Sequence, residues 1–122
     1  MHALVVGESL IDVIDGVDHM GGSPMNTAIA LARLGRKTRF ATCIGNDERG
    51  LLIREQLRVE GVHLANDPLT QAPTSTAIAR VAPDGSASYD IDLRWQPHVI
   101  DPRVLDSTAV LHIGSIAALV EP

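Results

Sequence analysis

Residues 21–35 combine a glycine pair, a carboxamide side chain and a mostly apolar helical pattern, which is typical of a ligand-binding loop that leads into a helix. Gly21 and Gly22 allow positive φ angles and let the backbone come close to a ligand. The N–H groups and the positive dipole end at the helix start would face a pocket, where Asn26 offers a donor and an acceptor. An ordinary turn, with Asn26 serving only the first helical turn, is the alternative interpretation.

A second set of polar side chains follows the first expected strand. Residues 3–6 form a short apolar segment typical of a buried parallel strand, and Glu8 and Asp12 come soon after it. Ligands of open α/β sheets bind outside the carboxyl ends of the strands, so both acids are well placed to contact one. Two alternatives stay open: a metal site, which has no histidine at ligand spacing beside it, and carboxylates that are simply solvated.

Motifs of several other chemistries are missing from the sequence. No Gly-x-Gly-x-x-Gly follows the first strand, which argues against a dinucleotide site. Residues 35–38 resemble the end of a phosphate-binding P-loop, but Arg36 interrupts the motif and a strand follows instead of a helix. The five histidines have no nucleophile or ligand spacing around them, and Cys43, the single cysteine, is most simply a small buried side chain.

Composition narrows the class of protein. The chain of 122 residues suits one domain, and its 45% of hydrophobic but 2% of aromatic residues requires an aliphatic core, which favours an α/β fold. A formal net charge of −5 without runs of Lys or Arg argues against nucleic acids and anionic membranes as partners. Because no long apolar segment and no signal peptide is present, we expect a soluble, cytoplasmic protein.

The elements that must position the polar side chains can be predicted in turn. The helix is expected to use Ser23 as N-cap, Pro24 in its first turn and Gly35 as its end, and to be buried because it is apolar on nearly every side. A tight turn is expected over residues 16–19. The other expected elements are strands over residues 37–44, 62–64 and 110–115, a helix from about residue 46 to Gly61, and a short helical turn at residues 101–102.

A hairpin interrupts this α/β order. Residues 74–82 and 86–92 alternate apolar and polar side chains on either side of a Pro-Asp-Gly turn. Such a half-exposed antiparallel pair differs from the buried parallel strands. A hairpin inserted in an α/β core is a candidate lid over a ligand site.

The order of these motifs resembles the N-terminal half of the PfkB-type family of sugar kinases, which includes ribokinase and fructokinase. The glycine-pair block followed by Gly-x-Asp-x-x-Gly is specific for the family. The matching segments cover essentially the whole chain: residues 7–12, 21–28, 31–35, 45–50, 74–77, 84–85 and 112–115. The resemblance implies that residues 1–122 form the N-terminal part of a ribokinase-like α/β domain, with a partly parallel sheet flanked by helices and an antiparallel lid at about residues 74–92.

The resemblance also implies where a sugar binds. In this family an Asp at the end of the first strand and the Asn after the glycine pair hydrogen-bond sugar hydroxyls, and the glycine backbone lies against the sugar. The lid strands cover the sugar and often build a homodimer. The implied substrate-binding residues are Asp12, Gly21, Gly22, Asn26, Ile78 and Tyr89, and the loop over residues 45–50 is expected to be structural.

The implied reaction transfers the γ-phosphate of ATP to a sugar hydroxyl, commonly with Mg²⁺. The family's Gly-Ala-Gly-Asp loop with its catalytic Asp is missing, so the fold is incomplete relative to the family and most of the ATP site lies elsewhere. The sequence therefore offers no catalytic and no metal-binding residue. Two alternatives stay open: a non-catalytic sugar-binding module and an inactive truncated fragment. Residues 113–116 point to the fructokinase branch.

Overall fold

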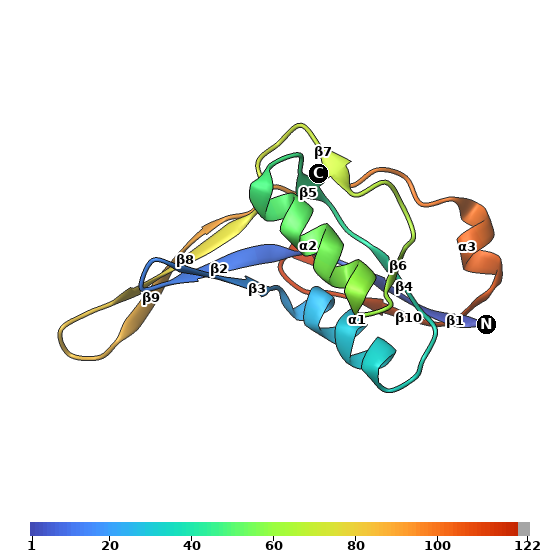
Figure 1. Cartoon of the computed structure of the whole chain (residues 1–122), viewed down its shortest axis with the longest axis horizontal. Coiled ribbons are helices and arrows are strands. Elements are labelled where there is room, and N and C mark those ends of the chain that lie inside the picture. The colour runs from blue at the N-terminus through green and yellow to red at the C-terminus, as the bar shows by residue number, and fades with distance from the viewer. Residues whose placement is uncertain (120–122) are drawn as a thin grey trace.

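A parallel sheet and a mixed sheet organise the chain in the computed structural model, which describes residues 1–119 (Figure 1). The parallel sheet has the order β10-β1-β4-β6, made of β1 (His2–Val6), β4 (Thr38–Ala41), β6 (His63–Leu64) and β10 (Thr108–Ile113). The mixed sheet has the order β3-β2-β8-β9, made of β2 (Leu10–Ile14), β3 (Val17–Gly21), β8 (Thr76–Val81) and β9 (Ala87–Asp92). The short strands β5 (Ile44–Gly45) and β7 (Leu69–Thr70) pair with each other.

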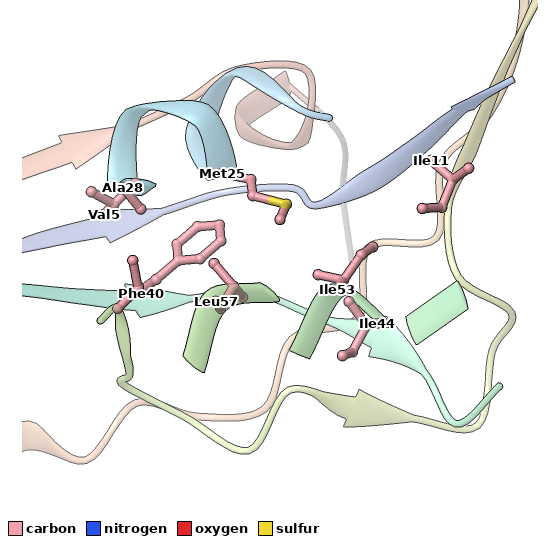
Figure 2. Close-up of a cluster of buried hydrophobic side chains, with 9 residues drawn as sticks. Val5, Ile11, Met25, Ala28, Phe40, Ile44, Ile53 and Leu57 are labelled. Carbon is pink, nitrogen blue, oxygen red and sulfur yellow. The ribbon is translucent and has the colours of Figure 1, made fainter. Parts of the chain in front are cut away.

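Helices cover the parallel sheet. The helices are α1 (Ser23–Arg33), α2 (Glu48–Val59), α3 (Pro102–Asp106) and the 3₁₀ turn η1 (Ala117–Leu119). On the face covered by α1 and α2, the fully buried ring of Phe40 lies near Met25 and Leu57 (Figure 2). On the other face, Leu4 packs in a smaller cluster with Val104 of α3. Both faces of β1 are therefore covered, as its continuous apolar sequence predicts.

The mixed sheet extends from this core as an arm, with the hairpin of β8 and β9 at its far end (Figure 1). The predicted hairpin is present, and β8 also pairs in parallel with β2. The expected turn over residues 16–19 is wrong, because the chain turns at Asp15 and Gly16, both with positive φ, and then forms β3. Val-Asp-His-Met in β3 has no clear alternation, so its strand is decided by pairing with β2.

Three further expectations about the elements need correction. The N-cap of α1 is Gly22, whose φ of 101° suits glycine, and no side chain caps this helix end. Helix α1 is also not buried on all sides, since Ser23, Asn26 and Ala30 are exposed. The expected strand over residues 37–44 divides into β4 and β5, which belong to different sheets.

The helix α2 begins and ends where the sequence predicts, with Asp47 as N-cap and Gly61 after its end.

His2 is a buried ring whose protonation should affect stability. Its nitrogens lie 3.3 Å from Ser107 Oγ and 3.0 Å from Thr108 Oγ1. Burial lowers the pKa of His2, and the positive charges of Arg39, the N-terminus and Lys37 lower this pKa further. The folded protein therefore holds the ring neutral at pH values where the unfolded chain protonates it.

We expect the contribution of neutral His2 to the free energy of unfolding to be fully present above its ordinary pKa of 6.5. This contribution should decrease as the pH falls toward the lowered pKa of the folded state. The slope contributed by one such group is at most about 1.4 kcal/mol per pH unit. Urea unfolding at a series of pH values from about 5 to 7.5 measures it. His2→Gln should flatten the dependence, whereas the exposed His63→Gln should keep it. An equal slope in wild type and His2→Gln contradicts this assignment.

Candidate functional site

A cavity of about 610 Å³ lies between the start of α1 and the base of the arm. Strand β2, the amino-terminal turns of α1 and the strands β8 and β9 form its walls, together with the loop after β10. Its lining residues are Glu8, Leu10, Asp12, Gly22, Ser23, Asn26, Thr27, Ala30, Ala77, Tyr89, Ile91, Ser115 and Ile116. The cavity thus joins the acidic segment, the glycine-pair loop and the hairpin that the sequence marks as separate features.

Asp12 and Asn26 are two polar side chains of this cavity whose groups no other described residue uses. Asp12 is half-buried in the middle of β2, and Asn26 is exposed on the first turn of α1. Within residues 1–119 neither side chain forms a hydrogen bond or ion pair with the protein. A carboxylate accepts hydrogen bonds only, whereas a carboxamide donates and accepts. Together they can bind a neutral ligand that carries several hydroxyl groups.

The two glycines leave space that a side chain at either position would fill. A Cβ on Gly21 would overlap the Asp12 carboxylate, so glycine is required for the observed position of Asp12. A Cβ on Gly22 would lie 2.8 Å from the carbonyl oxygen of Glu8, and the positive φ of Gly22 would be strained in any other residue. Gly22 lines the cavity, and Gly21 lies behind Asp12. Their backbone turns the chain from β3 into α1.

The arm contributes an apolar wall. Ala77, Tyr89 and Ile91 line the cavity, and the pairing of Ala77 with Ile91 places all three on one face of the sheet. Ile78 lies on the opposite face, where it pairs with Asp90, so the structure does not bring it to the cavity. Sequence reasoning singled out Ile78 and missed Ala77 and Ile91. The two-residue spacing of Tyr89 and Ile91 was the signal that could have found Ile91.

Glu8 has a different position from the one expected. It is neither solvated nor free to bind a ligand, because it is 2% exposed and accepts hydrogen bonds from the segment after β10. The donors are the amides of Ser115 (2.9 Å), Ile116 (3.1 Å) and Ala117 (3.2 Å) and the hydroxyl of Ser115. Burial raises the pKa of Glu8, but these hydrogen bonds outweigh burial and the pKa is lowered. Glu8 therefore anchors residues 115–117 as a carboxylate.

The loop over residues 45–50 is a structural unit, as predicted. Asp47 accepts hydrogen bonds from the amide of Gly50 at 2.8 Å, the amide of Thr74 at 2.9 Å and the hydroxyl of Thr74 at 2.6 Å. A Cβ on Gly50 would overlap the carbonyl oxygen of Gly45. The carboxylate thus caps α2 and ties it to the segment before β8.

Asp47→Ala is expected to lower the free energy of unfolding by about 2–3 kcal/mol, because the cap of α2 and the two contacts to Thr74 are lost together. Urea unfolding measures the loss, and the exposed Asp106→Ala is the matched control. Ligand binding at the cavity near Asp12 should be unchanged at temperatures where the variant is folded. A cost below about 0.5 kcal/mol would show that this network does not stabilise the protein.

A larger cavity of about 880 Å³ lies beside this loop, lined by Asn46, Gln71 and Gln96 among others. The titratable groups on its wall are already used, since Asp47 bonds Thr74 and Gly50, and His98 Nε2 lies 2.8 Å from the carbonyl oxygen of Leu69. We therefore place the candidate site at the smaller cavity, where no described residue pairs with the side chains of Asp12 and Asn26.

Two searches of the described chain bear on other kinds of site. Within residues 1–119, no three side chains of His, Cys, Asp or Glu lie together so that they could hold a metal ion. Among the described helices, none has the length and apolar character needed to cross a membrane.

Comparison with known proteins places the chain among kinases. The model of the "pfkB family carbohydrate kinase" matches residues 2–120. Probable fructokinase-4 of Arabidopsis thaliana is 33% identical over 125 residues, which cover 97% of this chain and 38% of that protein. The chain therefore spans about two fifths of the length of the curated relatives it matches.

Solved structures give the same result. Fructokinase from Xylella fastidiosa with bound ATP is 29% identical with a TM-score of 0.65, covering 74% of this chain and 32% of that chain. An uncharacterized sugar kinase from Pyrococcus horikoshii in complex with ATP has a TM-score of 0.81 at 22% identity, covering 98% of this chain and 45% of that chain. The α/β architecture of the described residues is thus that of the N-terminal part of such kinases.

Proposed function

Because the chain belongs to the pfkB family of carbohydrate kinases, we propose that it supplies the sugar-binding and lid part of a fructokinase-type enzyme. Such an enzyme transfers the γ-phosphate of ATP to a hydroxyl of a small-molecule sugar. In this proposal residues 1–122 are the N-terminal part of a ribokinase-like domain, and the hairpin at about residues 74–92 is its lid.

One observation carries the proposal: Asp12 and Asn26 line one cavity, and neither side chain has a partner among residues 1–119. Sugars offer neighbouring hydroxyls, which a carboxylate accepts from and a carboxamide can bind in both directions. A site built this way rejects molecules that leave its polar groups unpaired. Gly21 and Gly22 would let the backbone lie against the sugar, and Tyr89 would cover an apolar ring face.

The arm also supports a proposal about assembly. The face that carries Tyr89 and Ile91 also carries the exposed side chains of Ile14, Val17 and Val81. The opposite face carries the ion pair of Arg80 with Asp90. We propose that the apolar face covers the sugar near the core and pairs with a second copy farther out, which gives a homodimer through the lid.

We place the ATP and Mg²⁺ site in parts of the family fold outside these residues. The described chain gathers no group of three metal-binding side chains, and its sequence has neither a P-loop nor a Gly-Ala-Gly-Asp loop. These residues therefore do not fit an ATP and Mg²⁺ site, and we derive no step of phosphoryl transfer from them. We place the protein in the cytoplasm, where a single buried cysteine such as Cys43 stays reduced.

The proposal is tested by ligand-dependent thermal stabilisation. Millimolar D-fructose, D-ribose or 2-keto-3-deoxygluconate, without nucleotide, is expected to raise the unfolding temperature of the chain. A version extended past Pro122 is expected to phosphorylate the same sugar with Mg-ATP. Stabilisation without turnover by the extended version would support the non-catalytic sugar-binding module instead. No stabilisation and no turnover with any of these sugars would contradict the proposal.

The inactive truncated fragment is a second candidate, favoured by one observation. Strand β10 lies at the edge of the parallel sheet, and its side chains Val110, Leu111 and Ile113 are 52–59% exposed. Such an apolar edge invites self-association. Light scattering separates the two candidates, because a monodisperse, cooperatively unfolding sample excludes the aggregating fragment.

A further inference from the structure

Ser115 places a hydroxyl group at the candidate site, and the proton of this hydroxyl is already used in a hydrogen bond within the protein. Its Oγ lies within hydrogen-bonding distance of Glu8 Oε1, and Ser115 also lines the cavity with Asp12 and Asn26. Glu8 is buried, and as a carboxylate it can only accept. The Ser115 hydroxyl must therefore donate to Glu8. The Ser115 oxygen then has only lone pairs left for the cavity.

The fold explains why these distant residues meet. Strands β1 and β10 are parallel neighbours, so the residues that follow them leave the sheet at the same edge. Glu8 follows β1 and Ser115 follows β10, and the amides of Ser115, Ile116 and Ala117 all donate to the Glu8 carboxylate. The carboxylate thereby fixes the backbone that presents Ser115 and Ile116 to the cavity. Glu8 has no oxygen left for a ligand.

We propose that Glu8 is a positioning residue that makes Ser115 an acceptor-only contact for one sugar hydroxyl. The inference deepens the proposed function and rests on it. Asp12 is a second acceptor-only group of the same cavity. The site therefore selects ligands that direct hydroxyl donors at both Asp12 and Ser115, with Asn26 serving a group that needs a donor. A ligand position that can accept but not donate is rejected at both places.

The test is a double-mutant cycle on D-fructose affinity, measured by calorimetry with wild type, Ser115→Ala, Glu8→Gln and the double variant. Ser115→Ala removes the acceptor and keeps the three backbone donors of Glu8, and we expect about tenfold weaker binding with little change in unfolding temperature. Glu8→Gln should weaken binding at least as much, because its NH2 group replaces one acceptor oxygen and cannot accept from the donors of residues 115–117. In the Glu8→Gln background, Ser115→Ala should cost less than about twofold. Independent, additive effects of the two substitutions would overturn the proposal.

A ligand series tests the same selection. Monofluorinated fructoses replace one hydroxyl at a time by a group that cannot donate. The analogue altered at the hydroxyl that faces Ser115 should bind wild type about tenfold more weakly and should bind Ser115→Ala no worse than fructose does. An equal preference for fructose in both proteins would contradict the assigned contact.

The hydrogen bonds from residues 115–117 to Glu8 can also be tested without a sugar. Amide hydrogen exchange at Ser115, Ile116 and Ala117 is expected to be at least tenfold faster in Glu8→Gln than in wild type, while the exposed control Glu48→Gln leaves it unchanged. If wild type binds no sugar, the proposed function fails and the selection fails with it. If wild type binds fructose but Ser115→Ala and Glu8→Gln bind equally well, only the present inference fails.

Discussion

Asp12→Ala is expected to weaken sugar binding by about 30-fold to 1000-fold without destabilising the protein, because in the proposed site Asp12 gives its oxygens to the ligand alone. In the described chain its carboxylate has no protein partner, and Gly21, which lacks a Cβ, leaves room for it. If Asp12 had only a structural role, its removal would instead lower the unfolding temperature and leave the affinity for the sugar nearly unchanged.

Asp18→Ala is the matched control for this experiment. Asp18 lies on β3 beside β2, but its carboxylate pairs with Arg49 at 2.8 Å on the surface, away from the cavity. The control should keep full affinity for D-fructose and change the unfolding temperature little, because an exposed ion pair contributes little to stability. Calorimetric titration and thermal unfolding of both variants decide the matter. Wild-type affinity in Asp12→Ala would contradict a role for this carboxylate in the site.

Phe40→Ala is expected to cost about 3–5 kcal/mol of the free energy of unfolding, the largest loss from a single side chain of the core. Its ring is fully buried between the parallel sheet and the helices α1 and α2, and truncation leaves a cavity that the sheet cannot close (Figure 2). Because small domains are stabilised by only about 5–15 kcal/mol, much of the variant should be unfolded at body temperature.

Tyr89→Ala is the aromatic control for Phe40→Ala. Tyr89 is 57% exposed on the arm, so its removal should cost less than about 1 kcal/mol. It should instead weaken sugar binding, because the ring lines the cavity. Urea unfolding monitored by circular dichroism compares the two variants. Similar losses of stability in both would show that the core is not centred on Phe40.

The parts of the fold that follow local rules were predictable from the sequence. Asp47 before α2 and Gly61 after it mark that helix through capping chemistry. The Pro-Asp-Gly turn marks the hairpin of β8 and β9 in the same way. The glycine pair and Asn26 could be placed at a loop and the start of a helix, because that pattern is local as well.

The parts that depend on distant contacts were not predictable. Strand β3 forms by pairing with β2, and the division between β4 and β5 is set by the two sheets that they join. The position of Glu8 depends on Ser115, which is 107 residues away, so its burial leaves no local signal. The choice between Ile78 and Ile91 depends on which face of the arm meets the core. Only the register of the strands supplies that information.

The most direct test of the central claim is to locate a bound sugar on the chain. In a titration of isotope-labelled protein with D-fructose, saturable NMR shifts are predicted at the amides of Gly22 and Ser115 and at the side-chain amide of Asn26. Shifts confined to the other cavity, at Asn46 and Gln96, or no saturable shifts at all, would contradict a sugar site at Asp12 and Asn26.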